Sequence, residues 1–453
     1  MMEIKKSQRD FGDVLVSVGR FLKAAAEEIL SGIINNRVPA SASYLGLVIA
    51  VILYARADTW AASFFTTKYH LPEGLRVFLT YASIFSGWIL WGVRRAADRN
   101  RLLNKLKEAF QAASLKCNGR YPSLIEDLKI DNHVRRLRLH CHGVTKTDFE
   151  NAVERLESVL NMTVIRLLQD EGDKSKIEII YTMKDMQKTV ILENPDAFAD
   201  GQIPIGMTYE GPIHVNMRNV GHILVAGQTG GGKSNFLKVV TTVLTRNNPE
   251  AKVIFLDFKG GMETADIRNH AKNLGDNIEC FDGTKKCIEE LGRIGMALEE
   301  RFKTLSAVGA SNFDDYLKKK IAKAGPRKIT DRPEDERRTY IIVDEIAQLY
   351  AKDPEVEKER QDRAKAAVNR IARQGRAAGV HLVVATQKPD AQSFDQTVKT
   401  NLPAVLCFPM PNQASSVSAI GTKRAFEINP NIQGRAVWKF GPKLEEVQTY
   451  LFT

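Results

Sequence analysis

The sequence predicts an α/β fold in which short buried strands alternate with helices, and three observations support this. From about residue 203 onward, apolar and β-branched runs are separated by stretches of helical character. One run leads directly into a glycine-rich loop, and another ends in two carboxylates. This pattern is typical of a mainly parallel sheet with helices on both faces and nucleotide bound at the strand ends. The expected strands are Ile223–Ala226, Lys252–Asp257, Thr339–Glu345, His381–Thr386 and Pro403–Phe408.

The length and composition indicate a folded protein of two or three domains. The chain has 453 residues, of which 43% are hydrophobic and 26% charged, and this balance excludes a disordered chain. A net charge of +11 and a pI near 9.2 favour an anionic partner, either nucleic acid or an acidic lipid face. Five scattered cysteines without a C-x-x-C pair indicate reduced thiols in a cytosolic compartment.

The N-terminal hundred residues contain two uncharged apolar runs. Val38–Ala55 and Val77–Val93 are each close to the roughly 20 residues needed to cross a bilayer core. Basic residues precede the first run and follow the second, which predicts a transmembrane hairpin over residues 38–95 with both ends in the cytoplasm. A buried hairpin of a soluble domain is the alternative. The cytoplasmic segment 1–37 includes an amphipathic stretch, 11–35, that lies on the inner membrane face or packs on a neighbour.

Residues 96–200 are expected to form a charged linker helix and a small α/β module. Polar and apolar residues alternate strictly over 136–142, so the two leucines and Cys141 share the buried face of a strand. The histidines on either side of Cys141 lie on the opposite face, which argues against a metal site. The module is completed by a helix that a capping box at Thr147–Glu150 opens, through Val159, and by strands at Thr163–Leu168 and Ile177–Met183.

The glycine-rich loop after the strand expected at Ile223–Ala226 reads G-x-x-x-x-G-K-S. Backbone N–H groups of such a loop converge on an anion, Lys233 reaches the β- and γ-phosphates, and Ser234 offers a hydroxyl to Mg²⁺. An ordinary glycine turn is the alternative, but strand, loop, Lys-Ser pair and helix occur in register. The residues expected to bind the nucleotide are Gly227, Gln228, Thr229, Gly230, Gly231, Gly232, Lys233 and Ser234, together with Asp344.

The two carboxylates at the end of Thr339–Glu345 predict hydrolysis rather than binding alone. Asp344 is expected to hold the Mg²⁺ shell through water, with Ser234 as the other metal ligand. Glu345 is expected to point at a water beside the γ-phosphate and act as general base or water-positioner. A pair of carboxylates that caps the next helix is the alternative. Gln387, directly after the fourth strand, lies where its amide can sense the γ-phosphate; a plain surface amide is the alternative.

The ordered motifs resemble the motor domain of the FtsK/SpoIIIE DNA translocases, and the layout resembles conjugative coupling proteins of the TcpA type. The resemblance covers roughly residues 200–450, and the stretch 134–215 resembles the family's small preceding module more weakly. The motifs are GQTGGGKS, LDFKGG, YIIVDEIAQL, RIARQGRAAGVHLVVATQKPD and KTNLPAVLCF. The resemblance implies a RecA-like P-loop motor domain at 201–453 that forms a homo-hexameric ring. It also implies that ATP hydrolysis with Mg²⁺ between subunits drives DNA through a basic channel.

The resemblance also assigns roles and a setting. It implies catalytic roles for Glu345, Gln387 and Arg376, of which the last matches a finger that acts in the neighbouring subunit's site. Arg373, one helical turn away, competes for that role, and an exposed helix arginine is the alternative. The implied setting is the bacterial inner membrane. There a coupling protein would move plasmid or integrative-element DNA in conjugation, with a relaxase and secretion-channel proteins as partners.

Departures from the family pattern narrow this reading. The family's S-S-K-I-D-S-R segment appears as Pro411–Val417, so Ser415 and Val417 replace its Asp and Arg. No room for a winged-helix module or a long Pro/Gln-rich linker is expected, which argues against chromosome sorting. Type VII secretion ATPases remain an alternative, although they usually carry several motor copies in one chain. An ATP-binding scaffold is a further alternative. Lys259 or the basic loop 318–328 is expected to contact the DNA backbone, or to be a solvated charge run.

Overall fold

The computed structural model describes residues 73–452 except 132, 261–264, 266–268, 271–273, 325–332, 334–335 and 391–394. The expected segments 11–35 and 38–55 lie outside these residues. The second apolar run, 77–93, lies within helix α3 (Glu73–Ala112), whose side chains are described from residue 93 onward. No helix in the described part of the chain combines the length and apolarity needed to cross a bilayer. The chain forms two compact units, and the larger one comprises residues 129–134 and 182–453.

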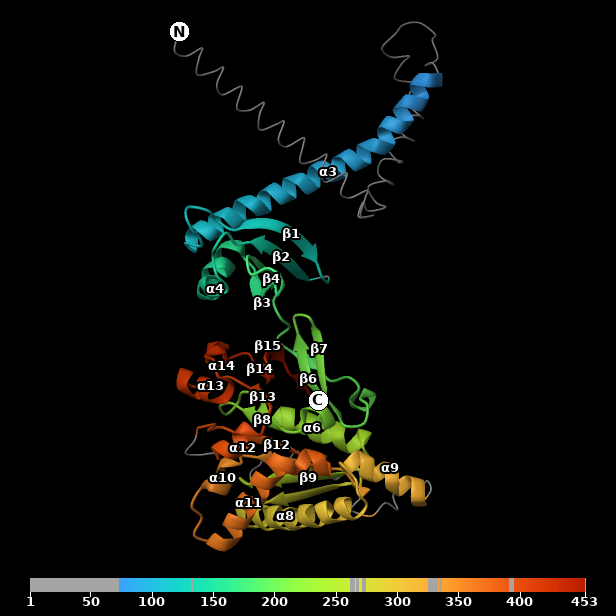
Figure 1. Cartoon of the computed structure of the whole chain (residues 1–453), viewed down its shortest axis with the longest axis vertical. Helices are drawn as coiled ribbons and strands as arrows, with labels where there is room; N and C mark the ends of the chain where they lie inside the picture. Colours follow the sequence, from blue (N-terminus) through green and yellow to red (C-terminus); the bar gives the residue numbers. More distant parts are fainter. Residues whose placement is uncertain are drawn as a thin grey trace. The chain divides into compact units, whose positions relative to one another are not determined.

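The smaller unit packs two helices on a four-stranded sheet (Figure 1). Its core joins Phe110 of α3 to Phe149 of α4, whose rings meet edge to face with centroids 6.2 Å apart. The predicted helix and strands are all present. The elements are α4 (Lys146–Leu160) and, in sheet order, β1 (Ser123–Lys129), β2 (Val134–His140), β4 (Lys176–Thr182) and β3 (Thr163–Gln169).

Helix α4 begins two residues earlier than predicted, because its N-cap is Thr145 and not Thr147. Thr145 caps it: its hydroxyl accepts from the Asp148 N–H at 3.2 Å, and the Asp148 carboxylate accepts from the Thr145 N–H at 2.8 Å. These bonds to the carboxylate lower the pKa of Asp148. The predicted box at Thr147–Glu150 was wrong because the same Thr-x-x-acid spacing occurs twice. The extended backbone needed at an N-cap falls on Thr145, and Glu150 instead pairs with Lys146.

Strand β2 confirms the alternation expected of it. Leu137, Leu139 and Cys141 are 0–1% exposed, whereas His140 and His142 lie on the other side with their rings stacked 4.3 Å apart. Burial raises the pKa of the Cys141 thiol to about 11. The side chain of Cys141 therefore lies on the buried face and those of the two histidines on the opposite face, as expected for the alternation of side chains along a strand.

The larger unit is built on a ten-stranded sheet. Its first six strands are parallel and its last four antiparallel. The five predicted strands are neighbours in the parallel part, which confirms the predicted α/β fold with a mainly parallel sheet. In sheet order the strands are β10 (Ile278–Asp282), β9 (Lys252–Asp257), β11 (Thr339–Asp344), β12 (Val380–Thr386), β8 (Ile223–Ala226), β13 (Ala404–Cys407), β14 (Arg435–Phe440), β15 (Lys443–Gln448), β6 (Gln202–Thr208) and β7 (Gly211–Asn216).

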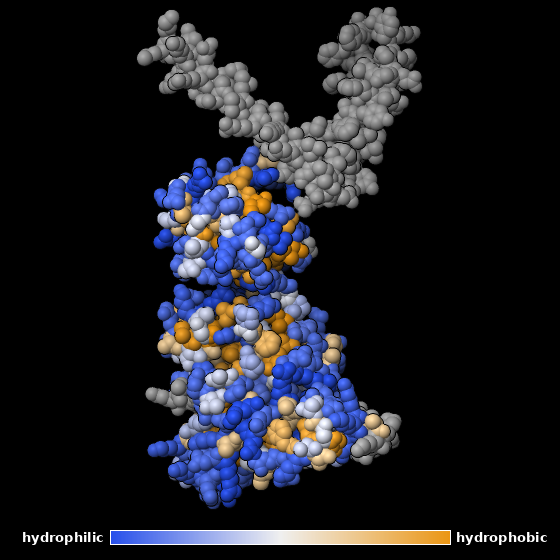
Figure 2. Space-filling view, viewed as in Figure 1, coloured by the Kyte–Doolittle hydropathy of each residue, from blue (hydrophilic) through white to orange (hydrophobic). Residues whose placement is uncertain are grey.

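Helices cover both faces of this sheet, because alternate residues of each buried strand point to opposite sides. On β8, Ile223 and Val225 pack with α6 (Lys233–Asn247), whereas Leu224 and Ala226 belong to the core under α8 (Thr284–Ala307) and α11 (Lys358–Gln374). These side chains are 0% exposed. In Figure 2 the visible face is mostly hydrophilic, with apolar side chains in separate patches.

Short elements complete the larger unit. Strands β5 (Val190–Ile191) and β16 (Tyr450–Leu451) form a separate parallel pair. The first part of the expected basic loop is instead helical, since Lys318–Lys320 lie in α9. The remaining helices are α5 (Met217–Val220), α9 (Phe313–Ala324), α10 (Ala347–Tyr350), α12 (Gln396–Thr400), α13 (Gln413–Ile420), α14 (Arg424–Glu427) and the 3₁₀ turns η1 (Pro195–Ala197) and η4 (Gly375–Ala378).

Candidate functional site

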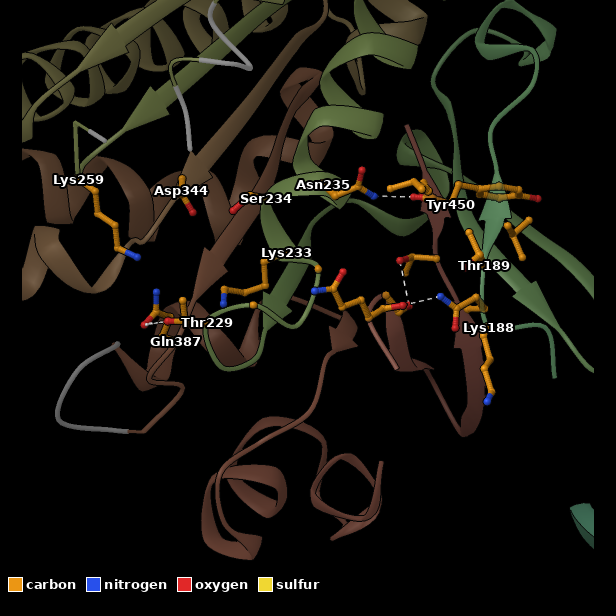
Figure 3. Close-up of a pocket in the computed structure, with 18 residues that line it drawn as sticks. Lys188, Thr189, Thr229, Lys233, Ser234, Asn235, Lys259, Asp344, Gln387 and Tyr450 are labelled. Atoms are coloured by element: carbon orange, nitrogen blue, oxygen red, sulfur yellow. Dashed lines mark hydrogen bonds between the residues drawn. The ribbon is translucent and has the colours of Figure 1, made fainter. Parts of the chain in front are cut away.

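The candidate site lies where the parallel strands end. Because β9, β11, β12, β8 and β13 run in one direction, their carboxyl ends meet at one edge of the sheet. Asp344 is in register with Asp257, and Thr386 is in register with Ala226. The glycine loop, Asp344 and Gln387 therefore come together, although they are far apart in the sequence (Figure 3), and Glu345 follows Asp344 directly.

The glycine loop is shaped by close packing as well as by turn geometry. Gly232 has φ +121, and a Cβ there would lie 2.9 Å from the Phe408 ring and 3.1 Å from the Gly434 Cα. Only glycine fits this position without displacing a neighbour. The Gly434 N–H also donates to the Gly231 carbonyl at 3.0 Å. The strand β14 region thus supports the loop from behind.

The loop delivers a helix start that is suited to an anion. Helix α6 begins at Lys233, and no described side chain caps its first turn. Its leading N–H groups are therefore available to a phosphate, with the helix dipole in support. The Lys233 ammonium donates to the carbonyls of Gly227 and Gln228 at 2.7 and 2.8 Å. Its charge lies at the mouth of the loop, where the phosphates of a nucleotide are expected.

Asp344 and Ser234 supply oxygen ligands on the wall of the same cavity. Burial raises the pKa of Asp344 to about 6, and Glu345 adds to this effect, while Lys259 and Lys233 act against it. A cation beside this carboxylate would relieve the cost of keeping it ionised. Carboxylate and hydroxyl oxygens are ligands that Mg²⁺ prefers, so these residues fit the predicted metal site.

Glu345 is held by contacts that the sequence did not reveal. It has φ +58, which is uncommon for a residue with a side chain, and it is 5% exposed. One carboxylate oxygen accepts from the Thr386 hydroxyl and from the Gln387 N–H, both at 3.1 Å, and the other lies 3.3 Å from the Lys259 ammonium. The carboxylate lines a second cavity instead of the cavity that contains Asp344. That Glu345 acts on a water beside the γ-phosphate stays a prediction, and it requires the carboxylate to turn from the second cavity toward the first.

Gln387 links the glycine loop to Glu345. Its side-chain oxygen accepts from the Thr229 hydroxyl at 3.1 Å, and its backbone N–H binds Glu345. Figure 3 shows the Thr229–Gln387 pair at the edge of the cavity, with Lys233 beside it. A residue placed in this way can transmit a change at the phosphates to the carboxylate. The structure places Gln387 beside the glycine loop, and its role as a sensor of the γ-phosphate stays a prediction.

The cavity between these groups has a volume of about 290 Å³, and half of its wall was not predicted. The Asn235 amide donates to the Tyr450 carbonyl at 2.6 Å and its oxygen accepts from the Phe452 N–H, so helix α6 holds the end of the chain against the cavity. No motif signals these residues. The unforeseen lining residues include Lys188, Thr189, Asn235, Gln433, Gln448, Thr449 and Tyr450.

A buried arginine fixes the part of the cavity wall that the sequence did not predict. Arg435 is 6% exposed and donates to Gln448, to Glu446 and to the carbonyls of Met186 and Gln187. It thereby fixes the segment that leads into Lys188 onto β14 and β15. Charge-assisted bonds of this kind position a wall firmly.

Neither candidate finger arginine lines this cavity. Arg376 lies in η4, immediately before β12 begins, so it is at the amino edge of the sheet, opposite the glycine loop. Its Nε donates to the Arg218 carbonyl at 3.0 Å. Arg373 lies in the last turn of α11, and both arginines are exposed. Within one chain, therefore, the structure does not bring Arg376 to the other predicted catalytic residues.

Comparisons with known proteins agree with this geometry. Residues 185–391 match the model of the FtsK/SpoIIIE family. The chain is 29% identical over 225 residues to DNA translocase FtsK of Staphylococcus aureus (strain Mu50 / ATCC 700699), covering 49% of this chain and 27% of that protein. It is 27% identical over 289 residues to DNA translocase SpoIIIE of Bacillus subtilis (strain 168), covering 60% and 34%. The chain thus spans about a third or less of the length of these relatives.

One solved structure shares the fold. It is the pCW3 conjugation coupling protein TcpA in its monomer form with ATPgS, at 22% identity and a TM-score of 0.52. The match covers 78% of this chain and 95% of that one.

Proposed function

We propose that this protein is an ATP-driven DNA translocase, because residues 185–391 match the model of the FtsK/SpoIIIE family. One observation carries the proposal: the glycine loop, Asp344, Glu345 and Gln387 meet at one edge of one sheet. This set holds a nucleotide and also contains a carboxylate and an amide suited to hydrolysis. A site for binding alone would not need Glu345.

Each residue has a role in that reaction. The backbone of the loop and the Lys233 ammonium hold the phosphates, and Ser234 and Asp344 hold Mg²⁺. When bound, Mg²⁺ neutralises charge that develops on the phosphates. Glu345 orients or deprotonates the attacking water, for which it must turn from the second cavity toward the first. Gln387 senses the γ-phosphate next to Thr229.

We propose that the active form is a homo-hexamer. Arg376 is exposed at the amino edge, so it reaches a nucleotide only in a neighbouring subunit. There it would neutralise charge on the transferred phosphoryl group. The net charge of +11 supports a polyanionic thread as the cargo, bound through its backbone without regard to sequence.

We further propose the role of a conjugative coupling protein in the bacterial inner membrane. Two apolar runs with basic flanks support a membrane hairpin at 38–95. The likeness to the conjugation coupling protein TcpA covers 78% of this chain, which is more than the motor domain, and supports the choice of plasmid or integrative-element DNA. A relaxase and secretion-channel proteins are the partners that this role requires.

The test is the ATPase rate of the full chain with and without DNA, compared with Lys233→Ala. We expect hydrolysis that DNA stimulates and that the substitution abolishes. DNA affinity should fall steeply with added salt, because each backbone contact releases counterions. Hydrolysis that is indifferent to DNA would exclude the translocase and favour a protein-export motor. The absence of any hydrolysis would favour an ATP-binding scaffold.

A further inference from the structure

A second cavity of about 300 Å³ lies beside the nucleotide cavity. The two cavities share Lys259 and Gln387 as lining residues, so these side chains form the partition between them. Asp344 lines the nucleotide cavity, whereas the next residue, Glu345, lines the second cavity. Two carboxylates that are consecutive in the sequence thus line two different cavities.

Three contacts hold Glu345 on the far side of the partition. Its two oxygens bind the Thr386 hydroxyl, the Gln387 N–H and, at 3.3 Å, the Lys259 ammonium. The first two contacts come from β12 and its end, which are fixed in the sheet. The third comes from a side chain that is 35% exposed and borders both cavities. Lys259 is therefore the partner of Glu345 that can move away.

The ion pair disfavours catalysis as long as it persists. Glu345 lines the second cavity and not the nucleotide cavity, so its carboxylate is not beside the γ-phosphate while the contact with Lys259 holds it there. Releasing Lys259 would free one oxygen of Glu345 and remove the charge that attracts it. Glu345 also has a left-handed backbone, with φ +58, which residues with a side chain rarely adopt unless their surroundings hold it.

The walls of the second cavity indicate what releases Lys259. Lys259 and Lys388 face one carboxylate, Glu345, so the cavity has an excess of positive charge, and the amides of Gln348 and Gln387 add hydrogen-bond donors. A phosphate with a full negative charge can compete with Glu345 for Lys259 in such a space. On the basis of the proposed function, that phosphate belongs to the DNA backbone.

We propose that the Lys259–Glu345 ion pair is a latch that restrains ATP hydrolysis, and that a DNA backbone phosphate entering the second cavity opens it. Lys259 is then a positioning residue, since it acts on the reaction only through Glu345. The latch couples hydrolysis to cargo: without DNA the base faces away from the nucleotide, and with DNA it is free to turn.

The experiment measures ATP hydrolysis by the full chain in detergent, with duplex DNA and without it, for the wild type, Lys259→Ala and Lys259→Arg. Loss of one partly buried ion pair should raise the DNA-independent rate of Lys259→Ala about fivefold. The stimulation by DNA should shrink by a similar factor. Lys259→Arg retains the pair and should behave like the wild type. Lys303→Ala, which removes an exposed lysine on α8, is the matched surface control and should change neither rate.

Two further readouts separate a latch from a folding defect. The thermal midpoint and the affinity for a fluorescent ATP analogue should be the same in Lys259→Ala as in the wild type. Lys388→Ala should need more DNA for half-maximal stimulation, because it removes positive charge from the second cavity.

A DNA-independent rate of Lys259→Ala at or below that of the wild type would overturn the latch, because Lys259 would then support catalysis or play no part. The result is distinguishable from failure of the proposed function. If the wild type itself hydrolyses ATP without response to DNA, the translocase proposal fails. If the wild type responds to DNA and Lys259→Ala responds equally, only the latch fails.

Discussion

The two edges of the motor sheet are both polar, but they are built for different purposes. At the carboxyl edge, Lys233 and Lys259 bind carbonyls and a carboxylate of the chain itself, contacts that a phosphate can replace. At the amino edge, His222, His381 and Arg338 are buried and bind one another and the backbone. The comparison teaches that contacts which a ligand can replace lie at the site of chemistry. Buried contacts whose hydrogen-bonding groups are already paired within the chain stabilise the fold instead.

The support at the amino edge is specific. The His381 ring donates from Nδ1 to the Gly221 carbonyl at 2.9 Å and accepts from Arg338 at Nε2 at 3.1 Å. Arg338 also donates to Asp314 at 2.5 Å and lies over the Phe313 ring, at 5.1 Å from its centroid. Burial, followed by the charge of Arg338, lowers the pKa of His381 to about 3. A neutral histidine therefore joins the starts of β8 and β11.

Arg376→Ala should have the largest effect of the substitutions that test this comparison, because Arg376 is the amino-edge residue to which we assign catalysis. In the assembled protein its loss should lower kcat about 10³-fold, as expected for a finger that acts in trans, and leave ATP binding unchanged. Steady-state ATPase assays with DNA measure the effect. Mixing Arg376→Ala with Lys233→Ala subunits should restore part of the rate, since an intact site can form between them. If Arg373→Ala has the larger effect, the role moves to Arg373.

Glu345→Gln tests the carboxyl edge. Removing the base should lower hydrolysis about 10²- to 10³-fold, while ATP binding and the thermal midpoint change little. The amide keeps the shape of the side chain and its contact with Thr386, so a fall in stability is not expected. Single-turnover hydrolysis compared with nucleotide binding separates the two effects. A rate close to that of the wild type would remove Glu345 from the chemistry.

Arg338→Ala should act on stability instead. It removes the hydrogen-bond donor of a buried histidine and a guanidinium that is 6% exposed, and the loss should be about 3 kcal/mol in the free energy of unfolding. Urea unfolding provides the measurement. Arg360→Ala is the matched control, because Arg360 pairs with two glutamates but is half exposed, so its loss should leave the free energy of unfolding nearly unchanged. Equal effects of the two substitutions would contradict the assignment of support to this edge.

Lowering the pH should reduce the free energy of unfolding through the two buried histidines at the amino edge, His222 and His381. Burial lowers the pKa of His222 to about 4 and that of His381 to about 3, below the value of 6.5 in an unfolded chain. The unfolded chain therefore binds more protons below pH 6.5, and stability that is complete above that pH is lost as the pH falls. Between pH 7.5 and 5 the loss should be on the order of 1 to 2 kcal/mol for each histidine. Urea unfolding across this range would show a flat profile if the histidines were already charged in the folded state.

The parallel half of the sheet was predictable, and the antiparallel half was not. The strands around Val225 and Ile342 are buried on both faces, so each appears in the sequence as an unbroken apolar run. Strand β15 (Lys443–Gln448) mixes charged and apolar residues with intermediate burial, and the edge strand β10 (Ile278–Asp282) is not buried. Such strands form because a neighbouring strand is present, and their own residues give a weak signal.

The same distinction applies to the site. The sequence alone determined the glycine loop, Asp344 and Gln387, because phosphate and metal binding demand particular residue types at fixed spacing along one strand–loop–helix unit. Only the tertiary structure placed Lys259 against Glu345 and brought Asn235 and Tyr450 to the same cavity. Those contacts join segments far apart in the chain, and what decides them is the order of strands in the sheet and the direction in which each side chain leaves it.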